Sequence, residues 1–160
     1  MPKNTVTISL PSLSELKKRT PRVYLKVSES NDGVRPFSKE VIEELGDLVK
    51  RTGIYVHLWE KSSTKTVVRY VGQTGDSFKK RLNKEFVLQN KQVSQSFREK
   101  IKEHIEKRNL YTVFFDDNDI QKMVMASRRK KRKKEVLRLL VEQAMIFAYN
   151  SNDLLNQHKK

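Results

Sequence analysis

The spacing of apolar residues along the chain predicts a mixture of short strands and helices. Segments in which polar and apolar side chains alternate, such as Thr5–Leu10, are typical of half-buried strands. Apolar residues three or four positions apart, as at Phe78 and Leu82, indicate one buried helix face. We expect strands at Thr5–Leu10, Val23–Val27, Ile54–Trp59, Thr66–Val71 and Leu110–Phe115. We expect helices that begin near Ser12, Ser38, Asp76 and Ser96, one that passes through Met123 and Met125, and a last one over about Lys134–Tyr149.

Capping and turn residues separate these elements. Ser12 and Glu15 form a capping-box pattern at the start of the first helix. Gly53 is expected to end the helix that begins near Ser38, because glycine adopts the conformation that closes a helix. The acidic segment Asp116–Asp119 lacks the glycine and the terminal glutamate of an EF-hand loop. We therefore interpret this segment as a turn and a helix cap.

Two neighbouring strands of this pattern predict a hairpin. Ile54–Trp59 and Thr66–Val71 are rich in β-branched and aromatic residues, and the short polar loop Glu60–Lys65 joins them. Such a pair is expected to be antiparallel. The glycines of Gly72–Gly75 end the second strand before the next helix. The predicted fold class is α+β, with a small mixed, mainly antiparallel sheet flanked by helices.

Composition narrows the function. The chain has 160 residues, with 34 Lys and Arg against 19 Asp and Glu, and a net charge of +15. This excess indicates a polyanionic partner, and we expect DNA. The absence of cysteine excludes a disulfide framework, a cysteine-ligated metal centre and a cysteine nucleophile.

The chain also shows no sign of a membrane location. No apolar stretch is long enough to span a membrane, and no leader sequence opens the chain. We expect a soluble intracellular protein without a membrane partner. Its place would be the cytoplasm or nucleoid, or the nucleus of a eukaryotic cell.

About half of the charge excess lies in one segment. Residues 121–140 hold nine Lys and Arg against one acid, Glu135. The run leads directly into the apolar last helix, which would hold these charges in a fixed position, as binding to a phosphate backbone favours. A solvated face or a disordered tail is the alternative interpretation. The expected DNA-binding residues are Lys79, Lys80, Lys84, Arg128, Arg129, Lys130, Lys131, Arg132, Lys133 and Lys134.

The predicted hairpin contains two tripeptides, Gly53-Ile54-Tyr55 and Tyr70-Val71-Gly72. With these tripeptides the chain resembles the GIY-YIG nuclease family. Three further features follow in the order of the family's motif: an arginine on the next helix, a glutamate on a later apolar helix and an asparagine beyond it. They are Arg81, Glu142 and Asn156, with Lys80 as the alternative to Arg81 in a neighbouring register.

The resemblance implies an endonuclease that hydrolyses DNA phosphodiester bonds, of a restriction-like or mobile-element type. Tyr55 would act as the general base or orient the attacking water, with Tyr70 in support. Arg81 would bind the scissile phosphate. Glu142 would hold a single Mg²⁺ or Mn²⁺ in each active site, and Asn156 would brace the site through hydrogen bonds.

Each of these residues also has an ordinary structural explanation. Tyrosines in apolar strands usually belong to the core, and an arginine among lysines usually lies on the surface. Glu142 could form an exposed pair with Arg138, one helical turn earlier. The chain also departs from the family, because Gln73 and Glu85 stand where many members have His or Lys. A non-catalytic nucleic-acid-binding protein on the same scaffold is therefore the alternative function.

The resemblance covers about residues 52–156 and suggests a division of the chain. We expect an N-terminal arm at residues 1–51, for DNA contact or dimerisation. Residues 52–160 would form the nuclease domain, with a basic insert at about 122–138. Cutting both strands of a duplex requires two subunits or sequential nicking, so a homodimer on DNA is one of two arrangements.

Overall fold

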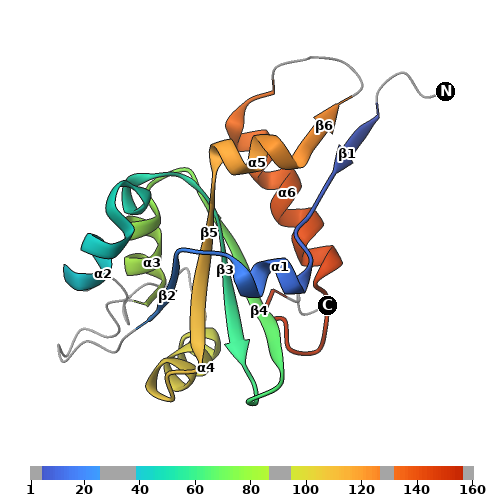
Figure 1. The fold of residues 1–160 in the computed structure, drawn as a ribbon. Coiled ribbons are helices and arrows are strands. Elements are labelled where there is room, and N and C mark those ends of the chain that lie inside the picture. Colours follow the sequence, from blue (N-terminus) through green and yellow to red (C-terminus); the bar gives the residue numbers. More distant parts are fainter. Residues whose placement is uncertain (1–4, 26–38, 87–94, 127–131, 157–160) are drawn as a thin grey trace.

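A four-stranded antiparallel sheet forms the centre of the protein, as the computed structural model shows (Figure 1). The structure describes residues 5–25, 39–86, 95–126 and 132–156. The strand order is β2-β5-β3-β4, with bounds of Arg22–Tyr24 for β2, Gly53–Glu60 for β3, Thr66–Thr74 for β4 and Leu110–Asp116 for β5. The predicted α+β class with antiparallel strands is confirmed.

A second sheet pairs two segments that are far apart in the sequence. Strand β1 (Val6–Ile8) is antiparallel to β6 (Val124–Ala126). Near it, the hydroxyl of Tyr149 donates a hydrogen bond of 2.5 Å to the carbonyl of Pro11. Strand β2, also from the N-terminal part, pairs with β5. The N-terminal residues that the structure describes therefore contribute a strand to each of the two sheets.

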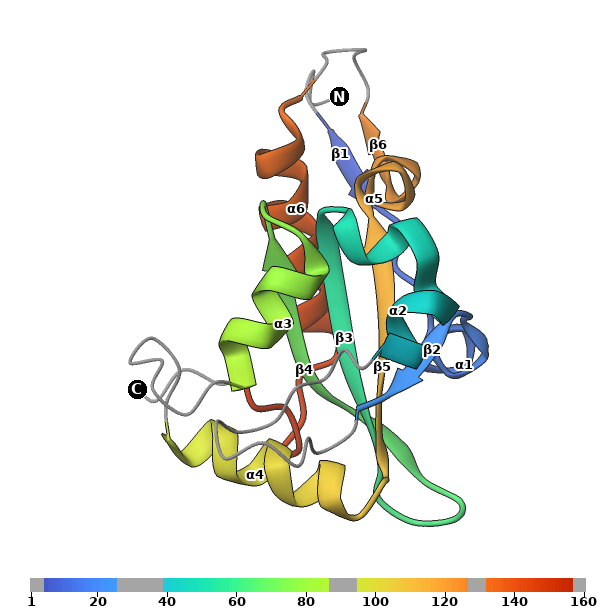
Figure 2. The ribbon, with the colours of Figure 1, turned by 90° about the vertical axis from the view of Figure 1, so that its left-hand side faces the viewer.

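Helices cover both faces of the central sheet (Figures 1 and 2). One face packs against α2, a 3-10 helix η1, α3 and α4, and the other against α1, α5 and α6. Their bounds are Leu13–Lys18 for α1, Lys39–Leu45 for α2, Gly46–Lys50 for η1, Phe78–Phe86 for α3, Gln95–Glu106 for α4, Asp117–Met123 for α5 and Lys134–Ala148 for α6. Strand β4 is an outer strand of the sheet, and α3 and α6 pack on opposite faces of the sheet.

The hairpin and the two capping segments agree with expectation. Strands β3 and β4 are antiparallel, with Tyr55 opposite Gly72 and Ile54 opposite Gln73. The capping box at Ser12 is present. Asp116 and Asp119 form a second capping box at the start of α5, so the acidic segment is a turn and helix cap, as predicted.

Some predicted boundaries are wrong. Helix α2 ends at Leu45 because Gly46 adopts a left-handed conformation, with φ of +57°. Gly53 starts β3 instead of ending a helix, and β4 continues through Gly72 to Thr74. Ladder pairing between β3 and β4 overrides the local turn tendency of these glycines.

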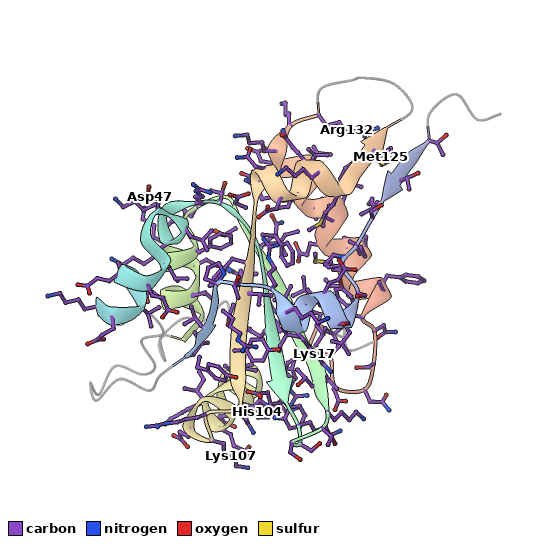
Figure 3. All side chains as sticks on the ribbon, in the orientation of Figure 1. Lys17, Asp47, His104, Lys107, Met125 and Arg132 are labelled. Carbon is purple, nitrogen blue, oxygen red and sulfur yellow. The ribbon has the colours of Figure 1, made fainter. Side chains whose placement is uncertain are left out.

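The chain after α5 also differs from expectation. Met125 lies on β6, opposite Thr7, and the predicted helix through it ends at Met123. Pairing with β1 makes this segment extended, and the side chain of Met125 is 66% exposed. Figure 3 shows Met125 and Arg132 at the end of the molecule where α6 begins. Residues 127–131 of the basic run, including Arg128–Lys131, lie outside the described part of the chain.

Gly53 holds the start of β3 close to the end of β5. An added Cβ at Gly53 would lie 2.0 Å from the carbonyl oxygen of Phe115. We expect Gly53→Ala to lower the free energy of unfolding by about 3 kcal/mol, because neighbouring backbone cannot move aside cheaply. The control Gly46→Ala, with open space around it, should cost about 1 kcal/mol from backbone conformation alone. Equal losses of the two variants in urea denaturation would contradict this explanation.

Candidate functional site

The phenol of Tyr55 lies across β4. Tyr55 is fully buried on β3, and its partner on β4 is Gly72. A Cβ at Gly72 would lie 2.3 Å from the Tyr55 hydroxyl oxygen, so only a glycine leaves room for this ring. The rings of Tyr55 and Tyr70 are 6.2 Å apart, and His57 lies beside both. The two predicted tyrosines therefore belong to one aromatic cluster of the hairpin.

Helix α3 brings Arg81 to this cluster. The buried residues Phe78 and Leu82 fix the helix against the sheet, and the hydroxyl of Ser77 caps it by accepting from the N–H of Lys80. Arg81 is half-buried and its Nε lies 3.4 Å from the Tyr55 hydroxyl. The side chain of Lys80 is exposed. The structure thus places Arg81, and not the alternative Lys80, beside Tyr55.

Helix α6 brings Glu142 to the same sheet edge from the opposite face. Val141 and Met145 are fully buried and anchor the helix, which leaves Glu142 half-buried. Burial raises the pKa of Glu142, and the charge of Arg81 and a hydrogen bond with Gln73 act in the opposite direction. The charge of Arg81 thus acts on Glu142 although the two helices cover different faces of the sheet.

Two sequence interpretations change here. Glu142 does not form the exposed pair with Arg138 that its spacing allows, because Arg138 is buried and forms an ion pair of 3.0 Å with Asp117. Gln73 stands out in the sequence only as a departure from the family, yet it lies close enough to Glu142 to lower the pKa of that carboxyl. The predicted hairpin places Gln73 opposite Ile54, near the end of the two strands. The alternation of polar and apolar residues along a strand does not show which side chain reaches a helix that packs on the sheet.

Asn156 closes the outer edge of β4. Its amide oxygen accepts from the N–H of Val71 at 2.7 Å, and its amide nitrogen donates to the carbonyl of Val71 at 2.7 Å. The N–H of Leu155 donates to the carbonyl of Arg69 at 2.7 Å. The segment that follows α6 thus hydrogen-bonds to the outer edge of β4 at Arg69 and Val71.

A cluster at the other end of β4 holds this segment. Arg69 donates to the carbonyl of Asp153 at 2.6 Å and to Nε2 of His104 at 3.2 Å, and lies over the ring of Trp59. The side chain of Asp153 pairs with Lys61 at 3.1 Å. Because Nε2 of His104 accepts this hydrogen bond from a guanidinium, Nε2 carries no proton and the ring is neutral. The cluster joins α4, the hairpin and the segment that contains Asn156.

The predicted basic residues are divided among several environments. Lys79, Lys80, Lys133 and Lys134 are exposed, and Arg132 is half-buried. Nothing is described of the side chain of Lys84 or of residues 128–131. Arg138 is the exception within the basic insert, because its ion pair with Asp117 is buried.

The donor set at the sheet edge fits a hard divalent ion that keeps most of its water. Glu142 offers one carboxylate, and Mg²⁺ is commonly bound by one or two carboxylates together with phosphate oxygens. Among the described residues there is no group of three or more His, Asp or Glu placed to hold a metal ion. The acids of the α5 cap are paired with Arg51, Arg138 and Arg19.

Comparisons with protein-family models, with curated proteins and with solved structures find no match to this chain. Within the described residues, no helix is both long and apolar enough to cross a membrane.

His104 should make stability depend on pH. Burial and the charge of Arg69 lower the pKa of His104 to about 4, against about 6.5 in an unfolded chain. Between these values the unfolded chain binds a proton that the folded protein does not. The free energy of unfolding should therefore fall by up to about 3 kcal/mol as pH drops from 6.5 to 4.

The variant His104→Gln keeps an acceptor for Arg69 but does not titrate. Urea denaturation at several pH values should show a flatter pH dependence for this variant than for the wild type. Parallel curves for the two proteins between pH 6.5 and 4 would contradict the assignment.

Proposed function

We propose that this protein is a metal-dependent DNA endonuclease with a GIY-YIG nuclease fold, of a restriction-like or mobile-element type. One observation supports this most: Arg81 contacts the Tyr55 hydroxyl and its charge acts on Glu142, although the three residues come from a strand and two helices on opposite faces. Packing alone does not require these three groups to interact. The motif order and the net charge of +15 support the same function.

Tyr55 and Arg81 have complementary tasks in phosphodiester hydrolysis. The Tyr55 hydroxyl would orient the attacking water or accept its proton, with the Arg81 guanidinium beside it. Arg81 presents several N–H donors, which suit the oxygens of a phosphate that gains charge in the transition state. A fully buried ring and a half-buried arginine are preorganised for these tasks.

Glu142 would hold one Mg²⁺ or Mn²⁺ together with water and the scissile phosphate. A bound divalent ion supplies Lewis-acid stabilisation of charge on the phosphate and the leaving oxygen. The carboxylate must be ionised to bind the ion, and burial raises its pKa. Asn156 is a positioning residue, because it bonds to the backbone of β4 and not to the reacting groups.

Cleavage of supercoiled plasmid DNA tests this function. We expect the wild type to nick the plasmid with Mg²⁺ or Mn²⁺, and Glu142→Gln and Arg81→Ala to lose at least about a hundredfold in rate, because each group stabilises the transition state. The controls are Glu135→Gln, an exposed acid on the same helix, and Lys100→Ala, an exposed cation on α4 outside the proposed site. Both controls should keep a rate within a few-fold of the wild type at saturating DNA.

Two results would refute the proposal. The first is a wild type that leaves DNA intact with every metal and substrate shape tried, which would favour a non-catalytic nucleic-acid-binding protein. The second is a Glu142→Gln protein that cuts as fast as Glu135→Gln.

A further inference from the structure

A polar pocket lies one helical turn from Arg138 along α6. Its volume is about 250 Å³, and its lining residues come from the end of η1, the start of β3, the start of α5 and the start of α6. The basic lining residues are Lys50, Arg51 and Lys134. Thr52 and Asn118 add polar side chains. None of these residues belongs to the proposed catalytic group.

The acids of this pocket are already neutralised. Asp116 pairs with Arg51 at 2.6 Å, and Asp117 pairs with the buried Arg138 at 3.0 Å. Lys50 and Lys134 form no ion pair with any other residue that the structure describes. The pocket thus keeps two uncompensated positive charges, and its chemistry suits an anion.

Helix α6 links the pocket to the catalytic edge. Lys134, Arg138 and Glu142 are spaced four residues apart, so they occupy successive turns on one side of the helix. With a rise of about 1.5 Å per residue, Lys134 lies about 12 Å along the axis from Glu142. With α6 placed along the duplex axis, where successive nucleotides of one strand rise about 3.4 Å, this distance corresponds to three or four nucleotides.

We propose that this pocket binds a second backbone phosphate of the DNA, three or four nucleotides from the scissile phosphate. Lys50 and Lys134 would contact that phosphate, and the Arg138–Asp117 pair would fix the distance between the pocket and Glu142. This inference rests on the proposed function for the position of the cut, but not for the binding itself.

Binding to a labelled 20-base-pair duplex in EDTA tests the pocket without cleavage. The double variant Lys50→Gln/Lys134→Gln should bind about tenfold more weakly, and the slope of log affinity against log salt should become shallower by about one, as for one lost phosphate. The matched control Lys18→Gln/Lys65→Gln removes the same charge from exposed positions on α1 and on the hairpin loop, and should change the affinity less than twofold. Equal losses in the two double variants would overturn the proposal.

Cleavage of shortened duplexes then tests the spacing. The duplex is trimmed separately on each side of the mapped cut. Wild-type kcat/KM should fall about tenfold once fewer than three nucleotides remain on one side. The kcat/KM of the pocket variant should be the same on that short duplex as on the long one. A pocket variant that loses as much from trimming as the wild type would overturn the spacing. If the wild type does not cut at all, the proposed function fails, and the binding measurement still decides the pocket.

Discussion

The hydrogen bonds between Asn156 and Val71 determine how the site is built. An outer strand presents unpaired N–H and C=O groups, and proteins usually cover or blunt such an edge. Here one amide side chain satisfies both groups of Val71, at 2.7 Å each. Val71 lies between Tyr70 and Gly72, so the same bonds hold the strand on which the Tyr55 ring rests. If this edge of β4 moved, the contact of 3.4 Å between the Tyr55 hydroxyl and Arg81 Nε would be lost.

Two ion pairs around the α5 cap, one of them buried, fix the frame beside the edge of β4. Asp116 ends β5 and pairs with Arg51, which follows η1, and the next residue, Asp117, pairs with Arg138 of α6. In the Arg138–Asp117 pair both side chains are buried, so removing one partner would leave an unpaired buried charge, which is strongly destabilising. The pair between Arg138 and Asp117 therefore sets the position of α6 along its axis, and with it the height of Glu142 at the sheet edge. The residues of the basic run therefore differ in role. Arg138 is structural, because it forms a buried ion pair, whereas the side chain of Lys134 is exposed to solvent.

Local sequence patterns predicted the helices and strands better than the contacts between them. The capping boxes at Ser12 and Asp116 need only residues three positions apart, and both are present. The strand at Met125 was missed because its partner β1 lies more than a hundred residues away, so a local apolar pattern favoured a helix. The motif order singled out Tyr55, Arg81 and Glu142, but it did not show that Gln73 lies close enough to Glu142 to lower its pKa. That proximity depends on how α6 crosses the end of β4, which is a matter of tertiary packing.

The most direct measurement is the position of a bound Mn²⁺, read from paramagnetic broadening of amide signals by NMR. The sample is the Tyr55→Phe protein bound to duplex DNA, in which turnover should be blocked. Broadening should centre on Gln73, Arg81 and Glu142, and should disappear when Glu142→Gln is added. Broadening that centres instead on the acidic segment Asp116–Asp119, or that persists without the Glu142 carboxylate, would contradict an active site at the edge of β4.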